Sequence, residues 1–284
     1  MTNIIDGNRI AAQIRAEVFR EVETLKSKGI TPGLTVVIVG ENPGSVVYVK
    51  NKEKDAKEVG FKSEVIRIPQ DTTQEYLLKV IDQLNKDETV HGLLIQLPLP
   101  KHIDELKVIE AINPQKDVDG FHPVNVGKVV IGDKRALVSC TPAGVIALLE
   151  HENLEIAGKE VVIVGRSNIV GKPLVPLFLQ KNATVTVCHS KSQDLRSITK
   201  RADILVVAIG KSRFITADYV KPGAVVIDVG INRLDGKLTG DVDFLEAATV
   251  ASKITPVPGG VGPMTRAMLL KNTIQAAKLQ NEVI

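Results

Sequence analysis

Short apolar runs alternate with amphipathic stretches along most of this chain. Runs rich in Val, Ile and Leu predict strands at 34–39, 62–68, 90–96, 160–164, 184–188, 204–208 and 225–228, with a short one near 252–254. Helical spacing of apolar positions predicts helices at 6–28, 45–60 and 72–85, and a last one at about 264–280. Near-continuous apolar strands that alternate with helices imply parallel sheets covered on both faces, an α/β fold.

The order of these elements predicts two α/β domains. A first αβ series fills residues 1–139, and a second begins near Cys140, where Thr141-Pro142 is typical of a helix start. No strand follows the last helix, so we expect about 265–284 to pack back on the first domain. The second domain is then 140–264, and a cleft is expected between the two.

Composition narrows the class of protein further. The chain has 284 residues, 44% hydrophobic and 24% charged, which is typical of a soluble globular protein. A net charge of +3, without a basic block, does not favour nucleic acid as a partner. Cys140 and Cys188 lack metal-site spacing and are expected to be reduced thiols of a cytoplasmic protein. The sequence predicts no membrane span, because no run reaches about 18 apolar residues.

Lys52 is the first candidate for chemistry. On a helical wheel with about 100° per residue, it falls between Ala56 and Val59 on the apolar side, one turn from Tyr48. The other lysines of this helix fall on the opposite, solvated side. A buried amine is costly while charged, so it must be paired or neutral. Lys52 is therefore a candidate base, or else the partner of Asp55 in a structural ion pair.

The segment VVIVGRSNIVGKP, residues 161–173, predicts a strand, a tight turn and a helix start. Gly165 and Gly171 do not have the spacing of a phosphate-binding P-loop, and Pro173 stands where that motif needs Ser or Thr. The full GxGxxG pattern of dinucleotide-binding turns is also missing. The motif alone is compatible with a dinucleotide site and with a glycine turn that binds nothing.

The end of the following strand favours NADP as the cofactor. An NAD site usually places an acidic residue about 20 residues on, to hold the ribose hydroxyls. Here the strand 184–188 runs into His189-Ser190-Lys191 without an acid. With Arg166, this makes a cationic pocket suited to the 2′-phosphate of NADP. The alternative is an ordinary polar loop.

Polar residues at two further places point to a ligand site in the first domain. Gln96 is the one polar residue of GLLIQLPLP and stands at the carboxyl end of a strand, where α/β proteins bind ligands. There Gln96 could contact Lys52, or its side chain could simply form local hydrogen bonds at the end of the strand. KDVDGF carries Asp117 and Asp119; Phe121 occupies the next calcium-ligand position, so no metal is expected. Asp117 and Asp119 either form part of an ordinary turn, or they place a carboxylate against the planar edge of a ligand that carries two N–H donors.

VPGGVGPMTRAM, residues 257–268, places three glycines and two prolines before a helix. The adjacent glycines let a flat ligand lie close to the backbone, and a helix start offers N–H groups. The alternative is a loop with a helix cap.

Together these segments resemble the bifunctional methylenetetrahydrofolate dehydrogenase/methenyltetrahydrofolate cyclohydrolase family. The resemblance rests on five motifs in the family's order across most of the chain: Tyr48-x-x-x-Lys52, IQLPLP at 95–100, KDVDG at 116–120, GRSNIVG at 165–171 and PGGVGPMT at 258–265. Asp55 and Arg266 are local departures from the family pattern and leave the motifs intact. The resemblance implies two α/β domains with a cleft, the second a Rossmann-like NADP-binding domain, and a cytoplasmic homodimer joined through these domains.

The resemblance also implies a role for each matching residue. Lys52 matches the catalytic lysine, Tyr48 the tyrosine that stacks on the folate, Gln96 the glutamine that tunes the lysine, and Asp119 the acid that binds the pterin. The folate site also includes the backbone of Pro258, Gly259, Gly260 and Val261. The NADP contacts match Gly165, Arg166, Ser167, Ser190 and Ile231.

The implied activity is the oxidation of methylene-tetrahydrofolate with NADP, followed by hydrolysis of the methenyl product. This activity has a place in one-carbon metabolism and purine biosynthesis. Three rivals remain at this point: a shikimate- or amino-acid-dehydrogenase-like enzyme that shares only the architecture, a protein that binds NADP and folate without turnover, and an enzyme that retains one of the two activities.

Overall fold

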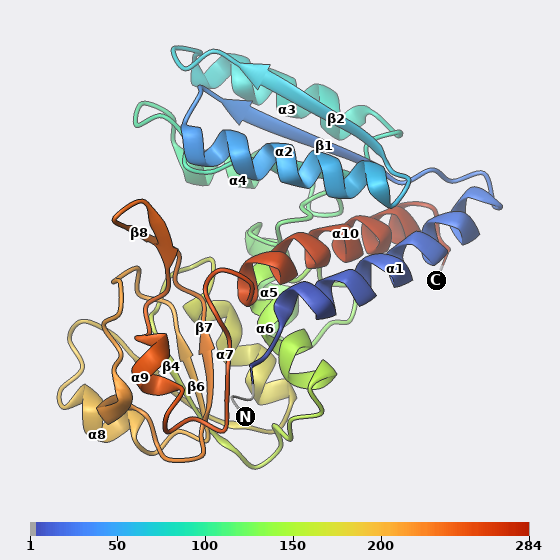
Figure 1. The fold of residues 1–284 in the computed structure, drawn as a ribbon. Coiled ribbons are helices and arrows are strands. Elements are labelled where there is room, and N and C mark those ends of the chain that lie inside the picture. Colours follow the sequence, from blue (N-terminus) through green and yellow to red (C-terminus); the bar gives the residue numbers. More distant parts are fainter. Residues whose placement is uncertain (1–3, 284) are drawn as a thin grey trace. The chain divides into compact units, whose positions relative to one another are not determined.

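The computed structural model of the protein describes residues 4–283, which form two compact units. The N-terminal unit comprises 13–140 and 269–283, and the C-terminal unit comprises 4–12 and 141–268. Two long helices contribute to both units, α1 (Gly7–Lys26) near the start of the chain and α10 (Val261–Gln280) at its end (Figure 1). Each unit has its own parallel sheet, which confirms the predicted α/β fold class.

The N-terminal unit is built on a three-stranded parallel sheet in the order β2-β1-β3. Every residue of the central strand β1 is buried, as its unbroken apolar run predicts. Helices α3 and α4 pack against one face of this sheet through buried side chains, among them Leu77, Ile81 and Val108. The elements are β1 (Gly33–Val39), α2 (Pro43–Glu58), β2 (Lys62–Ile68), α3 (Gln74–Lys86), β3 (Gly92–Ile95), α4 (Glu105–Ala111) and α5 (Pro123–Val130).

The C-terminal unit contains a five-stranded parallel sheet in the order β10-β7-β6-β4-β5. The chain runs from β4 to β5 on one side and then crosses to β6 on the other side of β4. The strand order therefore reverses between β4 and β6, the switch point at which open α/β sheets bind ligands. The parallel strands are β4 (Glu160–Val164), β5 (Thr184–Cys188), β6 (Ile204–Val207), β7 (Val225–Asp228) and β10 (Lys253–Ile254).

Five short or medium helical segments and one hairpin complete this unit. The hairpin pairs β8 (Asn232–Leu234) with β9 (Lys237–Thr239) in antiparallel fashion and projects from the unit (Figure 1). The helical segments are α6 (Cys140–His151), which begins at the last residue of the N-terminal unit, α7 (Gly171–Gln180), α8 (Leu195–Thr199), the 3₁₀ turn Ala217–Tyr219 and α9 (Phe244–Ala247).

The polar side chains of α10 attach its second half to the N-terminal unit. Asn272 donates to the carbonyls of Val118 and Val138, each at 2.8 Å, and Gln280 donates to the carbonyl of His91 at 2.8 Å. Lys278 forms an ion pair with Glu21 of α1. The end of the chain therefore stabilises the segment that carries the KDVDG motif.

The eight predicted strands are found with bounds that differ from the prediction by at most two residues, and the larger differences have physical causes. The β8–β9 hairpin escaped prediction because its three-residue strands are mixed in polarity and mostly exposed. The last helix begins at Val261, so Gly262 and Pro263 lie in its first turn rather than in the preceding loop. Within residues 4–283, we find no helix with the length and apolar character required to cross a membrane.

Candidate active site

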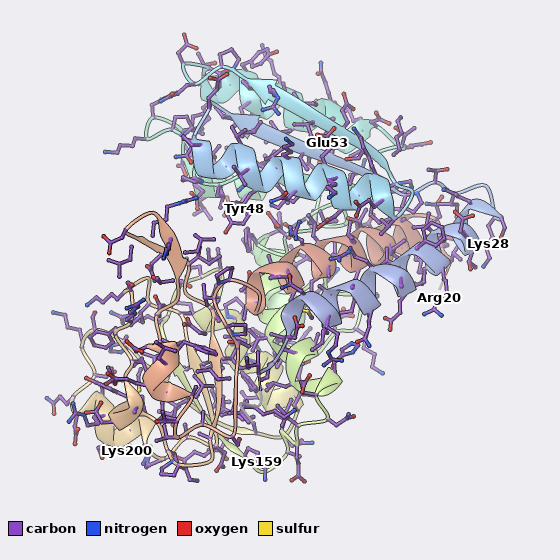
Figure 2. All side chains as sticks on the ribbon, viewed as in Figure 1. Arg20, Lys28, Tyr48, Glu53, Lys159 and Lys200 are labelled. Carbon is purple, nitrogen blue, oxygen red and sulfur yellow. The ribbon has the colours of Figure 1, made fainter. Side chains whose placement is uncertain are left out.

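Helix α2 carries the candidate lysine on its buried side. The helix begins after Asn42, whose side chain accepts hydrogen bonds from the N–H groups of Gly44 and Ser45. Lys52 is 9% exposed, and its neighbours Val49 and Ala56 are fully buried. Tyr48, one turn earlier, is 41% exposed and projects from α2 (Figure 2). The helix thus places a buried amine beside an accessible aromatic ring, as the helical wheel predicts.

The amine of Lys52 meets the side chain of Gln96. Its Nζ donates to Gln96 Oε1 at 3.1 Å, while Gln96 Nε2 donates to the carbonyl of Leu97 at 2.7 Å. The second bond orients the amide, so that its oxygen faces the lysine. Gln96 directly follows β3, and its N–H is held by the carbonyl of Val37 at 2.8 Å. Asp55, the other partner considered for Lys52, is buried on the same helix.

Asp119 lies within electrostatic reach of Lys52. Burial raises the pKa of the Asp119 carboxyl, and the positive charge of Lys52 opposes this shift. As a residue, Asp119 is half-buried near the end of the KDVDG segment. The N-terminal unit therefore brings together an amine, an amide and a carboxyl from α2, the end of β3 and the KDVDG loop.

Asp117, two residues before Asp119, forms its hydrogen bonds within the protein. Its buried carboxylate accepts the N–H groups of Phe121 and His122 at 3.2 and 2.9 Å and the amide of Asn125 at 2.9 Å. Burial raises the pKa of Asp117 to about 6, although these hydrogen bonds favour the ionised form. Because Asp117 is used to hold the loop, Asp119 is the acid available to a ligand.

Lys116 completes the support of this loop. Its buried Nζ donates to the carbonyls of Leu84 and Asp87, at 3.0 and 2.7 Å, at the end of α3. Burial lowers the pKa of Lys116. The sequence motif groups Lys116, Asp117 and Asp119, but it does not show which of them supports the backbone; only the hydrogen bonds separate the roles.

An open depression of about 850 Å³ lies at the same edge of the sheet as Gln96. It is lined by residues that follow β2 and β3: Gln70, Asp71, Leu99, Pro100, Lys101 and His102. Lys52, Gln96 and Asp119 are not among its lining residues, so this depression is separate from the three candidate side chains. Among residues 4–283, no group of three or more His, Cys, Asp or Glu side chains is arranged to hold a metal ion.

In the C-terminal unit, the candidate site is formed largely by backbone. Gly165 follows β4 with φ of 134°, and a side chain there would overlap the carbonyl of Ala208 at the end of β6. Ser167 Oγ accepts the N–H groups of Val170 and Gly171 at 3.2 and 3.4 Å, at the point where α7 begins. Arg166 is exposed beside this turn. A tight turn at the switch point of an open α/β sheet is where the phosphates of a dinucleotide typically bind.

The other predicted cofactor residues lie at the ends of neighbouring strands. Ser190 follows β5 in an exposed turn, in which His189 Nδ1 accepts the N–H of Lys191 at 3.1 Å. Ile231 follows β7 and is 49% exposed. The structure therefore brings the five predicted cofactor contacts to the carboxyl edge of one sheet, with no acidic side chain at the end of β5.

The glycine-rich segment of the predicted folate site belongs to the C-terminal unit. Pro258 is exposed and Gly260 is buried, and both precede α10. Val261 is buried in the first turn of that helix. The segment expected to lie against a flat ligand, Pro258, Gly259 and Gly260, is thus followed immediately by a helix N-terminus.

Fold and site together define an α/β protein with a dinucleotide-binding sheet and a separate unit that carries a buried lysine. Comparison with protein families gives the particular family. Residues 5–119 match the catalytic domain of tetrahydrofolate dehydrogenase/cyclohydrolase, and residues 139–281 match the NAD(P)-binding domain of the same enzymes. The chain belongs to the tetrahydrofolate dehydrogenase/cyclohydrolase family.

Individual relatives agree over nearly the whole chain. The bifunctional protein FolD of Halalkalibacterium halodurans is 58% identical over 275 residues, which are 97% of this chain and 98% of the relative. The crystal structure of the bifunctional FolD dehydrogenase/cyclohydrolase from Campylobacter jejuni has a TM-score of 0.96 at 48% identity, covering 98% of this chain and 99% of the other. The Trypanosoma brucei enzyme, complexed with NADP and an inhibitor, has a TM-score of 0.93 at 41% identity, with 97% of each chain covered.

These findings confirm several predictions made from the sequence. The predicted family, the two-domain α/β fold and the bifunctional enzyme class are confirmed. The predicted cofactor is confirmed by the NAD(P)-binding domain that the family model describes. The rival reading of an enzyme that shares only this architecture is excluded, because the match extends through the catalytic domain.

Proposed function

We propose that the protein oxidises 5,10-methylene-tetrahydrofolate with NADP and hydrolyses the methenyl product to 10-formyl-tetrahydrofolate, with Lys52 as the general acid and base of the hydrolysis. The observation that carries this proposal is the position of Lys52, a buried residue whose Nζ lies 3.1 Å from Gln96 Oε1 and within electrostatic reach of Asp119. An amine in this setting is positioned for proton transfer and is largely shielded from bulk water.

The oxidation requires little help from acid or base groups. Hydride leaves the methylene carbon, and a neighbouring nitrogen lone pair stabilises the cation that remains. NADP supplies the hydride acceptor when it is bound. The residues of this chain contribute by holding the substrate in position, because an oriented pair of reactants lowers the barrier without a proton step.

Hydrolysis of the methenyl cation needs proton transfer, and Lys52 is proposed to perform it. Water must lose a proton as it attacks the cationic carbon, and a proton must then reach the nitrogen that leaves. In the proposed mechanism, the Lys52 amine accepts the first proton and returns one to the nitrogen. Gln96 Oε1 accepts a hydrogen bond from Nζ, which holds the amine in one orientation through both transfers.

The remaining residues of the folate site are proposed to bind the substrate. The exposed ring of Tyr48 is suited to stacking on an aromatic part of the folate. Asp119 is suited to accept two N–H groups from the pterin edge, a charge-assisted bidentate contact. The backbone of Pro258, Gly259, Gly260 and Val261 is proposed to line the folate site.

The cofactor site is proposed to prefer NADP to NAD. Gly165 allows a tight turn at the switch point, and exposed Arg166 offers a guanidinium for the 2′-phosphate. Ser167, Ser190 and Ile231 are proposed as further contacts. The absence of an acid at the end of β5 supports the same preference.

We further propose a cytoplasmic homodimer, joined through the NADP-binding domains, with tetrahydrofolate derivatives as ligands and neither nucleic acid nor membrane as a partner. Residues 1–139 together with about 265–284 are proposed as the folate-binding catalytic domain, and 140–264 as the NADP-binding domain. The small net charge of +3 supports the first of the two exclusions.

A spectrophotometric assay tests the proposed function. Purified protein is mixed with methylene-tetrahydrofolate and NADP, and the formation of NADPH and the decay of the methenyl intermediate are followed in one cuvette. We expect sustained formation of NADPH together with decay of the methenyl intermediate to 10-formyl-tetrahydrofolate. Binding of NADP and folate without turnover would show a non-catalytic protein, and accumulation of methenyl-tetrahydrofolate would show that the hydrolysis is missing. Replacement of NADP by NAD measures the cofactor preference.

A further inference from the structure

The buried carboxylate of Asp241 connects three segments of the C-terminal unit. Its Oδ2 accepts the N–H groups of Ile209 and Gly210 at 2.6 and 2.9 Å, and its Oδ1 accepts the N–H of Lys211 at 2.8 Å and the side-chain amide of Asn232 at 2.8 Å. Its side chain is inaccessible to solvent. Four donors on one buried carboxylate are close to the number it can accept.

The segment held by Asp241 lies at the switch point of the sheet. Ile209, Gly210 and Lys211 come shortly after the end of β6, and Ala208 just before them faces Gly165 at the end of β4. Open α/β sheets bind their ligands in the crevice between these two strand ends. Asn232 begins β8 and directly follows the proposed cofactor contact Ile231. Asp241 therefore fixes loops after two strands, β6 and β7, that border this crevice.

A second buried carboxylate, that of Asp228, holds Asp241 itself. Asp228 Oδ1 accepts the N–H groups of Gly230 and Asp241 at 2.9 and 3.0 Å, and Oδ2 accepts the N–H of Val242 at 2.9 Å. Gly240 is required here, because a side chain at this position would overlap the Asp228 carboxylate. The two aspartates form a chain of hydrogen bonds from the end of β7 to the loop after β6.

Three consecutive backbone N–H groups usually form a concave site that attracts anions. In this protein the Asp241 carboxylate occupies the N–H groups of Ile209, Gly210 and Lys211, so that they cannot bind a phosphate. The Gly165 turn and Arg166, on the other side of the crevice, remain for the phosphates of the cofactor. The Asp241 carboxylate therefore blocks phosphate binding on one side of the crevice and leaves the Gly165 turn, on the other side, for the phosphates of the cofactor.

We propose that Asp241 is a positioning residue for the dinucleotide: by holding the β6 loop and Asn232, it shapes one wall of the NADP crevice and reserves phosphate binding for the Gly165 turn. This inference rests on the proposed NADP-dependent function. It assigns Asp241 no contact with the reacting atoms.

The variant Asp241→Asn tests the proposal, because an amide preserves the shape but can satisfy the donors of only one oxygen. Titration of NADPH fluorescence, without folate, should show a dissociation constant raised about tenfold or more, the factor that one well-formed polar interaction contributes. The KM for NADP should rise by a similar factor, while kcat at saturating NADP changes less than about threefold. Asn232→Ala, which removes a single donor, should give a smaller rise of the same kind.

A matched control lies at the opposite edge of the same sheet. Asp203 accepts the N–H of Glu160 at 2.9 Å and pairs with Lys221 at 2.7 Å, at the amino end of β6. Asp203→Asn alters a carboxylate with two hydrogen-bond partners at the end of β6 away from the crevice, and the dissociation constant of NADPH should remain within about twofold. Thermal melting of each variant measures the loss of stability separately.

The outcomes separate this inference from the proposed function. Wild-type protein that binds no NADPH would overturn the proposed function. Wild-type protein that binds NADPH, with Asp241→Asn binding it equally well, would overturn the inference alone. If Asp241→Asn fails to fold, Asn232→Ala decides: an unchanged dissociation constant for NADPH would overturn the inference. A lower melting temperature with unchanged cofactor affinity would show that Asp241 is only structural.

Discussion

The two units of this protein prepare their candidate sites in different ways. The N-terminal unit presents side chains with distinct chemistry, an amine, an amide and a carboxyl, on a helix and on the loops that follow its strands. The C-terminal unit presents mainly backbone, in glycine turns whose shape is fixed by internal hydrogen bonds. Proton transfer needs specific functional groups, whereas a dinucleotide needs space and N–H donors. The difference in construction therefore matches the difference in task.

Both units nevertheless use a buried aspartate in the same structural way. Asp117 and Asp228 each accept three N–H donors near the carboxyl edge of a parallel sheet. Each holds a loop next to a residue proposed to act on a ligand. A buried carboxylate can thus be part of the scaffold of a site, and burial alone does not identify the group that reacts.

The largest effect is expected for Lys52→Met, which should affect the hydrolysis far more than the dehydrogenase reaction. Lys52→Met keeps most of the apolar packing of the side chain and removes the amine. Hydrolysis of methenyl-tetrahydrofolate should fall by on the order of 10²–10⁴, the usual contribution of a general acid–base group. The dehydrogenase should remain measurable, because hydride transfer needs no proton at this position. Rates of both reactions with the purified variant provide the measurement.

Lys50→Met is the matched control for that variant. Lys50 lies on the same helix, two residues earlier, and is exposed. Its replacement should leave both rates within about twofold, since an exposed side chain without a special contact has little effect on the fold. Equal loss of both activities in a folded Lys52→Met protein would indicate a structural lysine and would contradict the proposed division of tasks.

A smaller effect is expected at Asp119, and it should extend to both reactions. Asp119→Asn removes the charge that is proposed to bind the pterin. A hydrogen bond to a charged group contributes about 1.5–3 kcal/mol, so the KM for the folate substrate should rise by on the order of 10- to 100-fold in both assays. Asp82→Asn, on the exposed side of α3, serves as the control. A rise in one assay only would show that Asp119 acts on chemistry rather than on binding.

At Arg166, the effect should be confined to one reaction and one cofactor. Arg166→Ala should raise the KM for NADP about tenfold, because a charge-assisted contact to the 2′-phosphate is lost, and should leave the KM for NAD nearly unchanged. Arg201→Ala removes an exposed arginine of the same unit that pairs with Glu160 at 3.7 Å and is the control. An unchanged KM for NADP in Arg166→Ala would contradict the argument for NADP from this side chain.

The sequence was sufficient to predict the elements whose residues share one environment. β1 and β4 are unbroken apolar runs, and a strand buried on both faces requires such a run. The β8–β9 hairpin is different, because its three-residue strands are mixed in polarity and mostly exposed, so that no apolar run marks them. Its signal was local: Asp235-Gly236 between the strands, both with positive φ, is the pair that tight hairpin turns favour.

The site could be predicted only in part for a similar reason. Lys52 was found because helical spacing places it among apolar residues, and Gln96 because it interrupts an apolar strand. Asp241 and Asp117 were not recognised as supports, since most of their partners are backbone N–H groups. Every residue except proline offers such a donor, so no side-chain pattern marks it. Only the folded backbone shows that Asp241 reaches a loop about 30 residues earlier in the chain.

The smallest expected effect compares the two scaffold aspartates by their response to pH. Burial raises the pKa of both Asp117 and Asp228 to about 6. In the unfolded chain these carboxyls have the ordinary pKa of about 3.9. Between these values the folded protein binds more protons than the unfolded chain, so each group contributes more stability as the pH falls from above 6 towards 4.

The stability difference between wild type and each Asn variant should therefore shift with pH. Asparagine does not titrate, so the free energy of unfolding of wild type relative to Asp117→Asn, or to Asp228→Asn, should increase by on the order of 1 kcal/mol between pH 7.5 and pH 5. Urea unfolding at the two pH values measures the shift, with each unit's variant tested separately. If only one variant shows the shift, only one of the two aspartates has a raised pKa in the folded protein. The two carboxyls would then share a hydrogen-bond pattern but differ in their electrostatic environment.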